Sequence, residues 1–168
     1  MSIEIFRGDI TTLQVDAIVN AANSSLTPGG AVGLAIHRAA GPELLAECMT
    51  HPGLHAGEAV ITAGYRLPAR YVIHAVGASW HGGQSKEDEQ LARAYRRSFA
   101  LANEHGVRSI AFPAISCGLY SFPAPAGAAV AVRETRAALR AGGSVERVIF
   151  ALFTDAVEQA FRDALAVE

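Results

Sequence analysis

Small polar residues and a glycine pair separate an apolar run, Ala17 to Val19, from a predicted helix that begins near Ala31. The segment from Asn20 to Val32 therefore joins a strand to a helix N-terminus, where backbone N–H groups are unpaired and the helix dipole is positive. Phosphate groups bind at such a place, and the amide of Asn23 can donate to one ribose hydroxyl while it accepts from its neighbour. The pattern predicts a site for a phosphate-containing ligand, with an ordinary strand-to-helix turn as the alternative.

A second loop of similar composition runs from Pro113 to Pro123, directly after another apolar run. Gly118 allows the backbone of this loop to approach a ligand closely. Two such loops can hold a diphosphate from both sides. The alternative is a glycine-containing turn in which Tyr120 and Phe122 pack into the core.

Two residues at the first and last predicted strands could contact a nucleobase. Asp9 follows the strand Ile3 to Phe6, and its carboxylate either caps a turn or accepts from the exocyclic amine of a base. Phe153 ends the strand Val148 to Phe153, where its ring either stacks on a base or packs in the core.

Other common catalytic and nucleotide-binding patterns are absent from the sequence. There is no G-x-x-x-x-G-K-[ST], and no G-x-G-x-x-G follows the first strand, which argues against a P-loop NTPase and a Rossmann dehydrogenase. Cys117 has no His or acid bound to it by a local motif, so we do not expect a nucleophile. His51, His55 and His81 could form a metal site with Cys48. Pro52 and Gly53, however, prevent His51 and His55 from lying one turn apart on a helix. We expect no metal and no cofactor.

Length and composition favour one globular domain over residues 1–168. The 168 residues are 51% hydrophobic and 18% charged, as in a packed domain. A net charge of -2 disfavours binding to nucleic acid, including RNA. No apolar stretch approaches the roughly 18 residues that a membrane span needs, and charged residues occupy the N-terminus where a signal peptide would be apolar. With Cys48 and Cys117 expected as reduced thiols, we predict a cytoplasmic protein.

Apolar, β-branched runs alternate with helical patterns along the chain. The remaining strands are expected at Ala59 to Thr62, Tyr71 to Val76 and Ser109 to Phe112. The remaining helices are expected at Glu43 to Thr50, at Pro125 to Arg140 and from Asp155 onward. One more helix is expected to begin at a capping box of Ser85 with Asp88 and to end at Gly106. This alternation predicts an α/β fold, a three-layer α/β/α sandwich with a mostly parallel, mixed six-stranded sheet. The ligand crevice is then expected beyond the carboxyl ends of the strands, at the loops after Val19, Val76, Phe112 and Phe153.

The segments together resemble the macrodomain family, the ADP-ribose-binding fold, and within it the bacterial MacroD-like branch. The matching segments are Gly8 to Thr11, Asp16 to Asn23, Gly29-Gly30 leading into Ala35 to Gly41, Tyr71 to Gly77, and Ile115 to Pro123. They cover nearly the whole chain, in order and with the family's spacing. The resemblance implies that the partners are ADP-ribose and its O-acyl or protein-linked derivatives, including ADP-ribosylated proteins.

Site residues are implied by this resemblance position by position. Asp9 would accept from the adenine N6 amine, the Ile10 N–H would support the base, and Phe153 would stack on it. Asn23 would hold the distal ribose, whose anomeric carbon is the reacting centre, and is the expected catalytic residue. The other implied ligand-binding residues, which surround the diphosphate, are Gly29, Gly30, Ala31, Val32, Gly33, Ser116, Cys117, Gly118, Leu119 and Tyr120.

The chain departs from the family pattern at Gly33, where hydrolases of the MacroD type usually have an aspartate. Ala31, Leu34 and Cys117 are milder changes from Gly, Gly and Thr. Loss of a general base costs roughly 10² to 10⁴ in rate, although a diphosphate oxygen of the substrate can orient the water instead. Two hypotheses follow: a hydrolase of O-acetyl-ADP-ribose or of ADP-ribosylated acidic side chains with reduced activity, and a reader module that binds ADP-ribose with little or no turnover. The loop from Ser79 to Gln84 is expected to influence which derivative is used.

Overall fold

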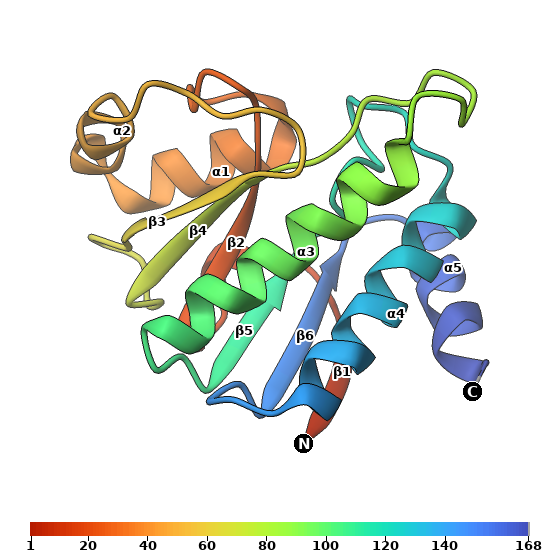
Figure 1. Ribbon diagram of the computed structural model, residues 1–168. Helices are drawn as coiled ribbons and strands as arrows, with labels where there is room; N and C mark the ends of the chain where they lie inside the picture. Colours follow the sequence, from red (N-terminus) through yellow and green to blue (C-terminus); the bar gives the residue numbers. More distant parts are fainter. Residues whose placement is uncertain (168) are drawn as a thin grey trace.

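A mixed sheet of six strands forms the middle layer of the computed structural model, which describes residues 1–167 (Figure 1). The strands are β1 (Ser2–Arg7), β2 (Ala17–Ala22), β3 (Ala59–Ala63), β4 (Tyr71–Val76), β5 (Ser109–Phe112) and β6 (Arg147–Leu152). Their order is β1-β6-β5-β2-β4-β3, and every neighbouring pair is parallel except β3 with β4. The predicted mostly parallel, mixed sheet is confirmed.

Helices cover both faces of this sheet. They are α1 (Gly30–Ala40), α2 (Pro42–Cys48), α3 (Glu87–Glu104), α4 (Ala124–Ala141) and α5 (Asp155–Ala166), with a short 3-10 turn, η1 (Ile10–Thr12). In Figure 1, α3 and α4 cross in front of the sheet, and α5 packs beside α4. On the opposite face α1 and α2 pack against a separate apolar cluster that includes Ile18, Ile36 and Leu44. The central strands β2 and β4 are mostly apolar because both of their faces are buried, with Asn20 and His74 as their buried polar residues.

Three predictions next to the expected ligand crevice were wrong. Strand β6 ends at Leu152, so Phe153 is the first residue after the strand. Strand β2 continues to Ala22, so Asn20 belongs to a strand and the connecting loop spans only residues 23–29. The capping box of Ser85 with Asp88 does not form, because α3 begins at Glu87 after Lys86, whose φ is +62° and which gives no side-chain cap. Glu87 itself accepts hydrogen bonds from the preceding loop.

The loops that follow β2, β4, β5 and β6 lie along one edge of the sheet, the upper edge in Figure 1. Parallel strands bring their carboxyl ends to the same edge, which is where ligands bind in open α/β sheets. Within residues 1–167, no helix is both long enough and apolar enough to cross a membrane.

Candidate functional site

A cavity of about 250 Å³ lies between the carboxyl ends of the strands and the N-terminus of α1. The structure brings most of the sequence-predicted residues to this one cavity. They are Asn23, Gly29, Gly30, Ala31, Val32, Gly33, Ser116, Cys117, Gly118, Leu119, Tyr120 and Phe153. Asp9 and Ile10 are not among the lining residues.

Sequence reasoning did not single out ten further lining residues, although half of them lie within the loops of residues 20–32 and 113–123 that it identified. These are Ala21, Ala22, Gly77, Pro113, Ala114, Ile115, Ala151, Leu152, Thr154 and Val157. Most have small or apolar side chains that read as ordinary core residues in the sequence. Apart from Val157, which lies in α5, they end or follow a strand, and this is the feature that could have identified them.

The N-terminus of α1 faces the cavity without a capping side chain. Gly29 is the N-cap residue, and no side chain bonds to the first turn. Gly30 has a φ of +68°, a conformation that favours glycine, and a Cβ there would lie 3.4 Å from a methyl carbon of Leu119. The first N–H groups of a helix have no partner within it. They are therefore available to an anion in the cavity.

The loop of residues 116–121 faces α1 across the cavity and is held by internal hydrogen bonds. Ser116 has a φ of +69°, and its carbonyl oxygen accepts from the Phe122 N–H at 2.9 Å. The Cys117 N–H donates to the carbonyl of Ala114 at 3.2 Å and so is already used. Within residues 1–167, no acceptor is recorded for the N–H groups of Gly118 and Leu119. The backbone of this loop thus offers a second set of donors.

Gly77 and Ser116 bring the loop after β4 into close contact with the loop after β5. A Cβ at Gly77 would lie 2.0 Å from the Ser116 Oγ and 2.7 Å from Ile115 Cγ2, so only glycine fits there. The Ser116 Oγ is buried and has no hydrogen-bond partner in the described part of the chain. The tight packing maintains the left-handed conformation of Ser116.

The side chain of Asn23 organises its own loop. Its Oδ1 accepts from the Thr27 N–H at 3.0 Å, and its Nδ2 donates to the Thr27 carbonyl at 3.0 Å. The hydroxyl of Ser25 also donates to Oδ1, at 3.2 Å. Nδ2 also donates to the Thr27 hydroxyl at 3.3 Å. A ligand hydroxyl would therefore have to replace that bond in order to use the second hydrogen of the amide.

Asp9 and Phe153 follow two neighbouring strands, since Asp9 lies after β1 and Phe153 directly after β6. Oδ1 of Asp9 accepts from the Thr11 N–H at 2.9 Å and from the Thr11 hydroxyl at 2.7 Å, so the turn-capping role that the sequence offered is present. Phe153 lines the cavity and is 46% exposed, so it is not a core residue. Its carbonyl oxygen accepts from the Arg7 guanidinium at 2.9 Å, which holds the backbone beside the ring.

A buried polar cluster lies beneath Gly33. A Cβ at Gly33 would meet only Asn20 Oδ1, at 3.5 Å, which is ordinary van der Waals contact. Asn20 Nδ2 lies 3.1 Å from His74 Nδ1, and His74 Nε2 lies 3.0 Å from the Thr62 hydroxyl. Burial lowers the pKa of His74 to about 3, so its ring is neutral at physiological pH. Asn20 Oδ1 and both ring nitrogens of His37 are buried without a partner in the described residues.

No charged side chain of the described residues lines the cavity. Burial also raises the pKa of the Cys117 thiol to about 11, so this side chain is a protonated thiol at neutral pH. Within residues 1–167, no group of three or more His, Cys, Asp or Glu side chains is arranged to hold a metal ion. An anionic ligand in the cavity would therefore depend on backbone N–H groups and the helix dipole.

Comparison with known proteins gives consistent matches over the chain. The Macro domain family model matches residues 19–131. A Macro domain-containing protein of Chlorobaculum tepidum is 52% identical over 164 residues, which cover 98% of this chain and 95% of the relative. A Klebsiella pneumoniae protein named O-acetyl-ADP-ribose deacetylase is 50% identical over 167 residues, which cover 97% and 95%.

Solved structures match the fold closely. A macrodomain of Oceanobacillus iheyensis with ADP superposes with a TM-score of 0.93 at 38% identity, covering 98% of this chain and 90% of that one. A Trypanosoma brucei macrodomain in complex with ADP-ribose gives a TM-score of 0.91 at 41% identity, covering 97% and 68%.

Proposed function

This chain belongs to the Macro domain family, and from that premise we propose that it binds ADP-ribose and hydrolyses ADP-ribose esters. The substrates proposed are O-acetyl-ADP-ribose and proteins that carry mono-ADP-ribose on acidic side chains. A relative that is 50% identical bears the name O-acetyl-ADP-ribose deacetylase, which supports the first of these.

The observation that carries the proposal is the pair of N–H donor sets that face one uncharged cavity. One set is the uncapped N-terminus of α1 from Gly30, and the other is the backbone of Gly118 and Leu119. A diphosphate between them would accept hydrogen bonds from both sides, and the positive end of the α1 dipole would stabilise its charge. Because no lysine or arginine of residues 1–167 lines the cavity, these donors supply the recognition of the anion.

The two ends of the ligand would extend from this diphosphate in opposite directions. The adenine would lie against the half-exposed ring of Phe153, with its N6 amine donating to Asp9. Both bonds from Thr11 to Asp9 end on Oδ1, so Oδ2 is the oxygen proposed for the adenine. The Ile10 N–H would support the base. Asn23 would hold the distal ribose at the other end, with one amide hydrogen directed to a ribose hydroxyl.

Hydrolysis would add one water molecule to the ester and release ADP-ribose and a carboxylic acid. Water would attack either the acyl carbon or the anomeric carbon of the distal ribose. With no acid or histidine among the described lining residues, a diphosphate oxygen of the substrate would orient the water and accept its proton. This substrate-assisted route predicts a slow enzyme, since a general base is typically worth roughly 10² to 10⁴ in rate.

A reader module that binds ADP-ribose with little turnover is the second candidate. The observation that favours it is Gly33, which leaves the floor of the cavity beside α1 without a carboxylate. Both candidates share the same ligand and differ only in chemistry.

Calorimetric titration with ADP-ribose, beside turnover assays with O-acetyl-ADP-ribose and a mono-ADP-ribosylated protein, tests both candidates. We expect binding and slow turnover by the native chain. Gly33→Asp should raise the rate by roughly 10²-fold or more by restoring a base, whereas Gly33→Ala, which adds a Cβ without an acid, should not. Absence of ADP-ribose binding would overturn the proposal. Binding without turnover in both the native chain and Gly33→Asp would select the reader.

A further inference from the structure

A second cavity of about 250 Å³ adjoins the first one, and the two share Gly77 and Tyr120. The lining of the second cavity is more polar than that of the first and includes a charged side chain. Ser24, Ser79, His81, Ser85, Glu87 and Gln90 supply its polar side chains. Ser24 directly follows Asn23, so the second cavity opens beside the end of the first cavity that Asn23 lines.

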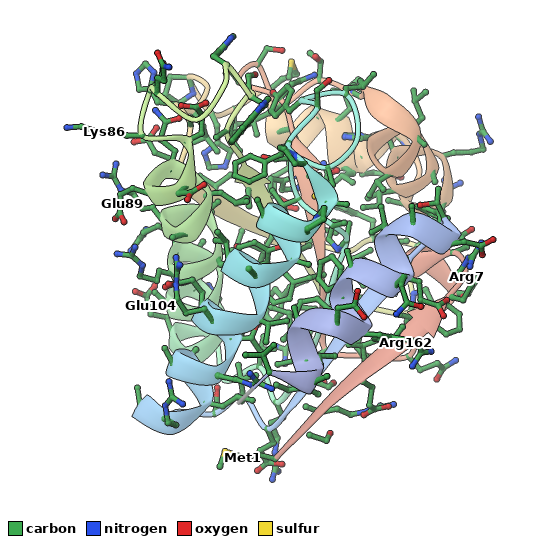
Figure 2. All side chains as sticks on the ribbon, turned by 90° about the vertical axis from the view of Figure 1, so that its right-hand side faces the viewer. Met1, Arg7, Lys86, Glu89, Glu104 and Arg162 are labelled. Atoms are coloured by element: carbon green, nitrogen blue, oxygen red, sulfur yellow. The ribbon has the colours of Figure 1, made fainter. Side chains whose placement is uncertain are left out.

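Glu87 shapes the wall of this second cavity. Its side chain is almost fully buried, and its carboxylate accepts from the N–H groups of His81 at 3.0 Å, Gly83 at 2.8 Å and Ser85. The hydrogen bond from the His81 backbone, with those from Gly83 and Ser85, lowers the pKa of this carboxyl group. Glu87 is thus an ionised group that orders the loop of residues 81–85, and its oxygens are already used. Lys86, in contrast, points away from the molecule (Figure 2).

Trp80, which directly precedes the loop of residues 81–85, joins it to the loop of residues 116–121 in the first cavity. The Trp80 N–H donates to the carbonyl of Tyr120 at 2.8 Å. The Trp80 ring packs edge-to-face on Phe122 with ring centroids 5.0 Å apart. The walls of the two cavities are therefore connected through Trp80, Tyr120 and Phe122.

We propose that the second cavity is a subsite for the peptide that carries ADP-ribose on an acidic side chain. This inference rests on the proposed function, in which Asn23 holds the distal ribose and its substituent extends past Ser24. An acetyl group has three non-hydrogen atoms and, at roughly 30 Å³ for each water-sized group, needs far less than the cavity offers. Hydroxyl, imidazole and amide side chains suit the polar backbone of a peptide better than an apolar acyl chain.

The test compares calorimetric affinities for free ADP-ribose and for a peptide that carries ADP-ribose through a hydrolysis-resistant amide linkage. We expect the native chain to bind the modified peptide about tenfold more tightly, a gain of about 1.4 kcal/mol. Ser79→Trp, which fills the cavity, and Glu87→Gln, which weakens the hold on the loop, should remove this gain and leave the affinity for ADP-ribose within about twofold. The matched control is Glu89→Gln, an exposed acid on the same helix that bonds to Arg96.

The outcomes separate this inference from the function on which it rests. If ADP-ribose binds but the modified peptide gains nothing over it, or if Ser79→Trp keeps the full gain, the subsite is overturned and the ADP-ribose site stands. If neither ligand binds, the proposed function falls and the subsite falls with it. The unmodified peptide, which should not bind measurably, shows that the gain depends on the ADP-ribose group.

Discussion

The side-chain amide of Asn23 forms two hydrogen bonds to the backbone of Thr27. Its Oδ1 accepts from the Thr27 N–H and its Nδ2 donates to the Thr27 carbonyl, both at 3.0 Å. A residue proposed to hold the ribose therefore also builds the loop that leads to the N-terminus of α1. Gly29 belongs to the same arrangement, because a Cβ there would lie 3.0 Å from Asn23 Nδ2. Loss of the Asn23 side chain would therefore remove the proposed ribose contact and also change the conformation of the loop.

Asn23→Ala is expected to lower turnover by about 10²-fold or more, as for loss of a group that positions a reacting centre, and to lower stability by about 1 kcal/mol through the lost hydrogen bonds. Turnover assays and urea unfolding measure the two effects. Ser25→Ala is the control, because it removes the 3.2 Å bond to Asn23 and the 2.9 Å bond with the Thr27 hydroxyl but leaves both bonds between Asn23 and the Thr27 backbone. Unchanged turnover in Asn23→Ala would refute the assignment of the reacting centre.

Gly77→Ala should destabilise the chain and weaken ADP-ribose binding, because the new Cβ would lie 2.0 Å from the Ser116 Oγ. Overpacking of this kind costs about 1 to 3 kcal/mol, which urea unfolding can measure. A Cβ at Gly118 meets nothing within 4 Å, so Gly118→Ala should leave stability unchanged. Combining Gly77→Ala with Ser116→Gly should recover part of the loss. Native stability in Gly77→Ala would show that the two loops separate freely.

Acid should destabilise the protein through His74. Its pKa is about 3 in the folded state because of burial, against an ordinary histidine value of 6.5. The unfolded state therefore binds a proton that the folded state excludes, and stability falls as pH drops below about 6.5, by up to about 1.4 kcal/mol per unit. His37, whose pKa is also lowered by burial, acts in the same direction. Urea unfolding at pH 7.5, 6.0 and 5.0 measures the slope.

The slope assigned to His74 has a direct control. His74→Leu should reduce the loss of stability between pH 6 and pH 5 by about 1 kcal/mol, even if it lowers stability at every pH by removing the bonds to Asn20 and Thr62. His55→Gln changes an exposed side chain and should leave the slope as it is. Equal slopes in the native chain and His74→Leu would contradict the prediction.

Cys117 should be dispensable for turnover. Burial raises the pKa of its thiol to about 11, and only a thiolate is nucleophilic. Cys117→Ser is therefore expected to keep turnover within a few fold of native, and iodoacetamide at pH 7.5 should label the folded protein slowly. Loss of turnover in both Cys117→Ser and Cys117→Ala would restore the nucleophile hypothesis.

Much of the architecture could be predicted from the sequence because it depends on local patterns. Apolar runs such as Tyr71 to Val76 identify strands buried on both faces, and their alternation with helical periodicity leads to a mostly parallel sheet. Glycines and small polar residues after two such strands, with a helix beginning at Gly30, predict an anion site at one edge of the sheet. The failed capping box at Ser85 shows the limit of local patterns, because Glu87 bonds backward to the loop instead.

By itself, then, the sequence determined the fold class and the family and predicted the kind of ligand, since each depends on residue types at fixed spacing. Only the tertiary structure decided which groups meet across the chain. The contact of Gly77 with Ser116, the neutral pair of His74 with Asn20 beneath Gly33, and the second cavity ordered by Glu87 all join residues from different loops and strands. Burial and close contact set the pKa values and the available donors there, and neither property exists until the strands are assembled.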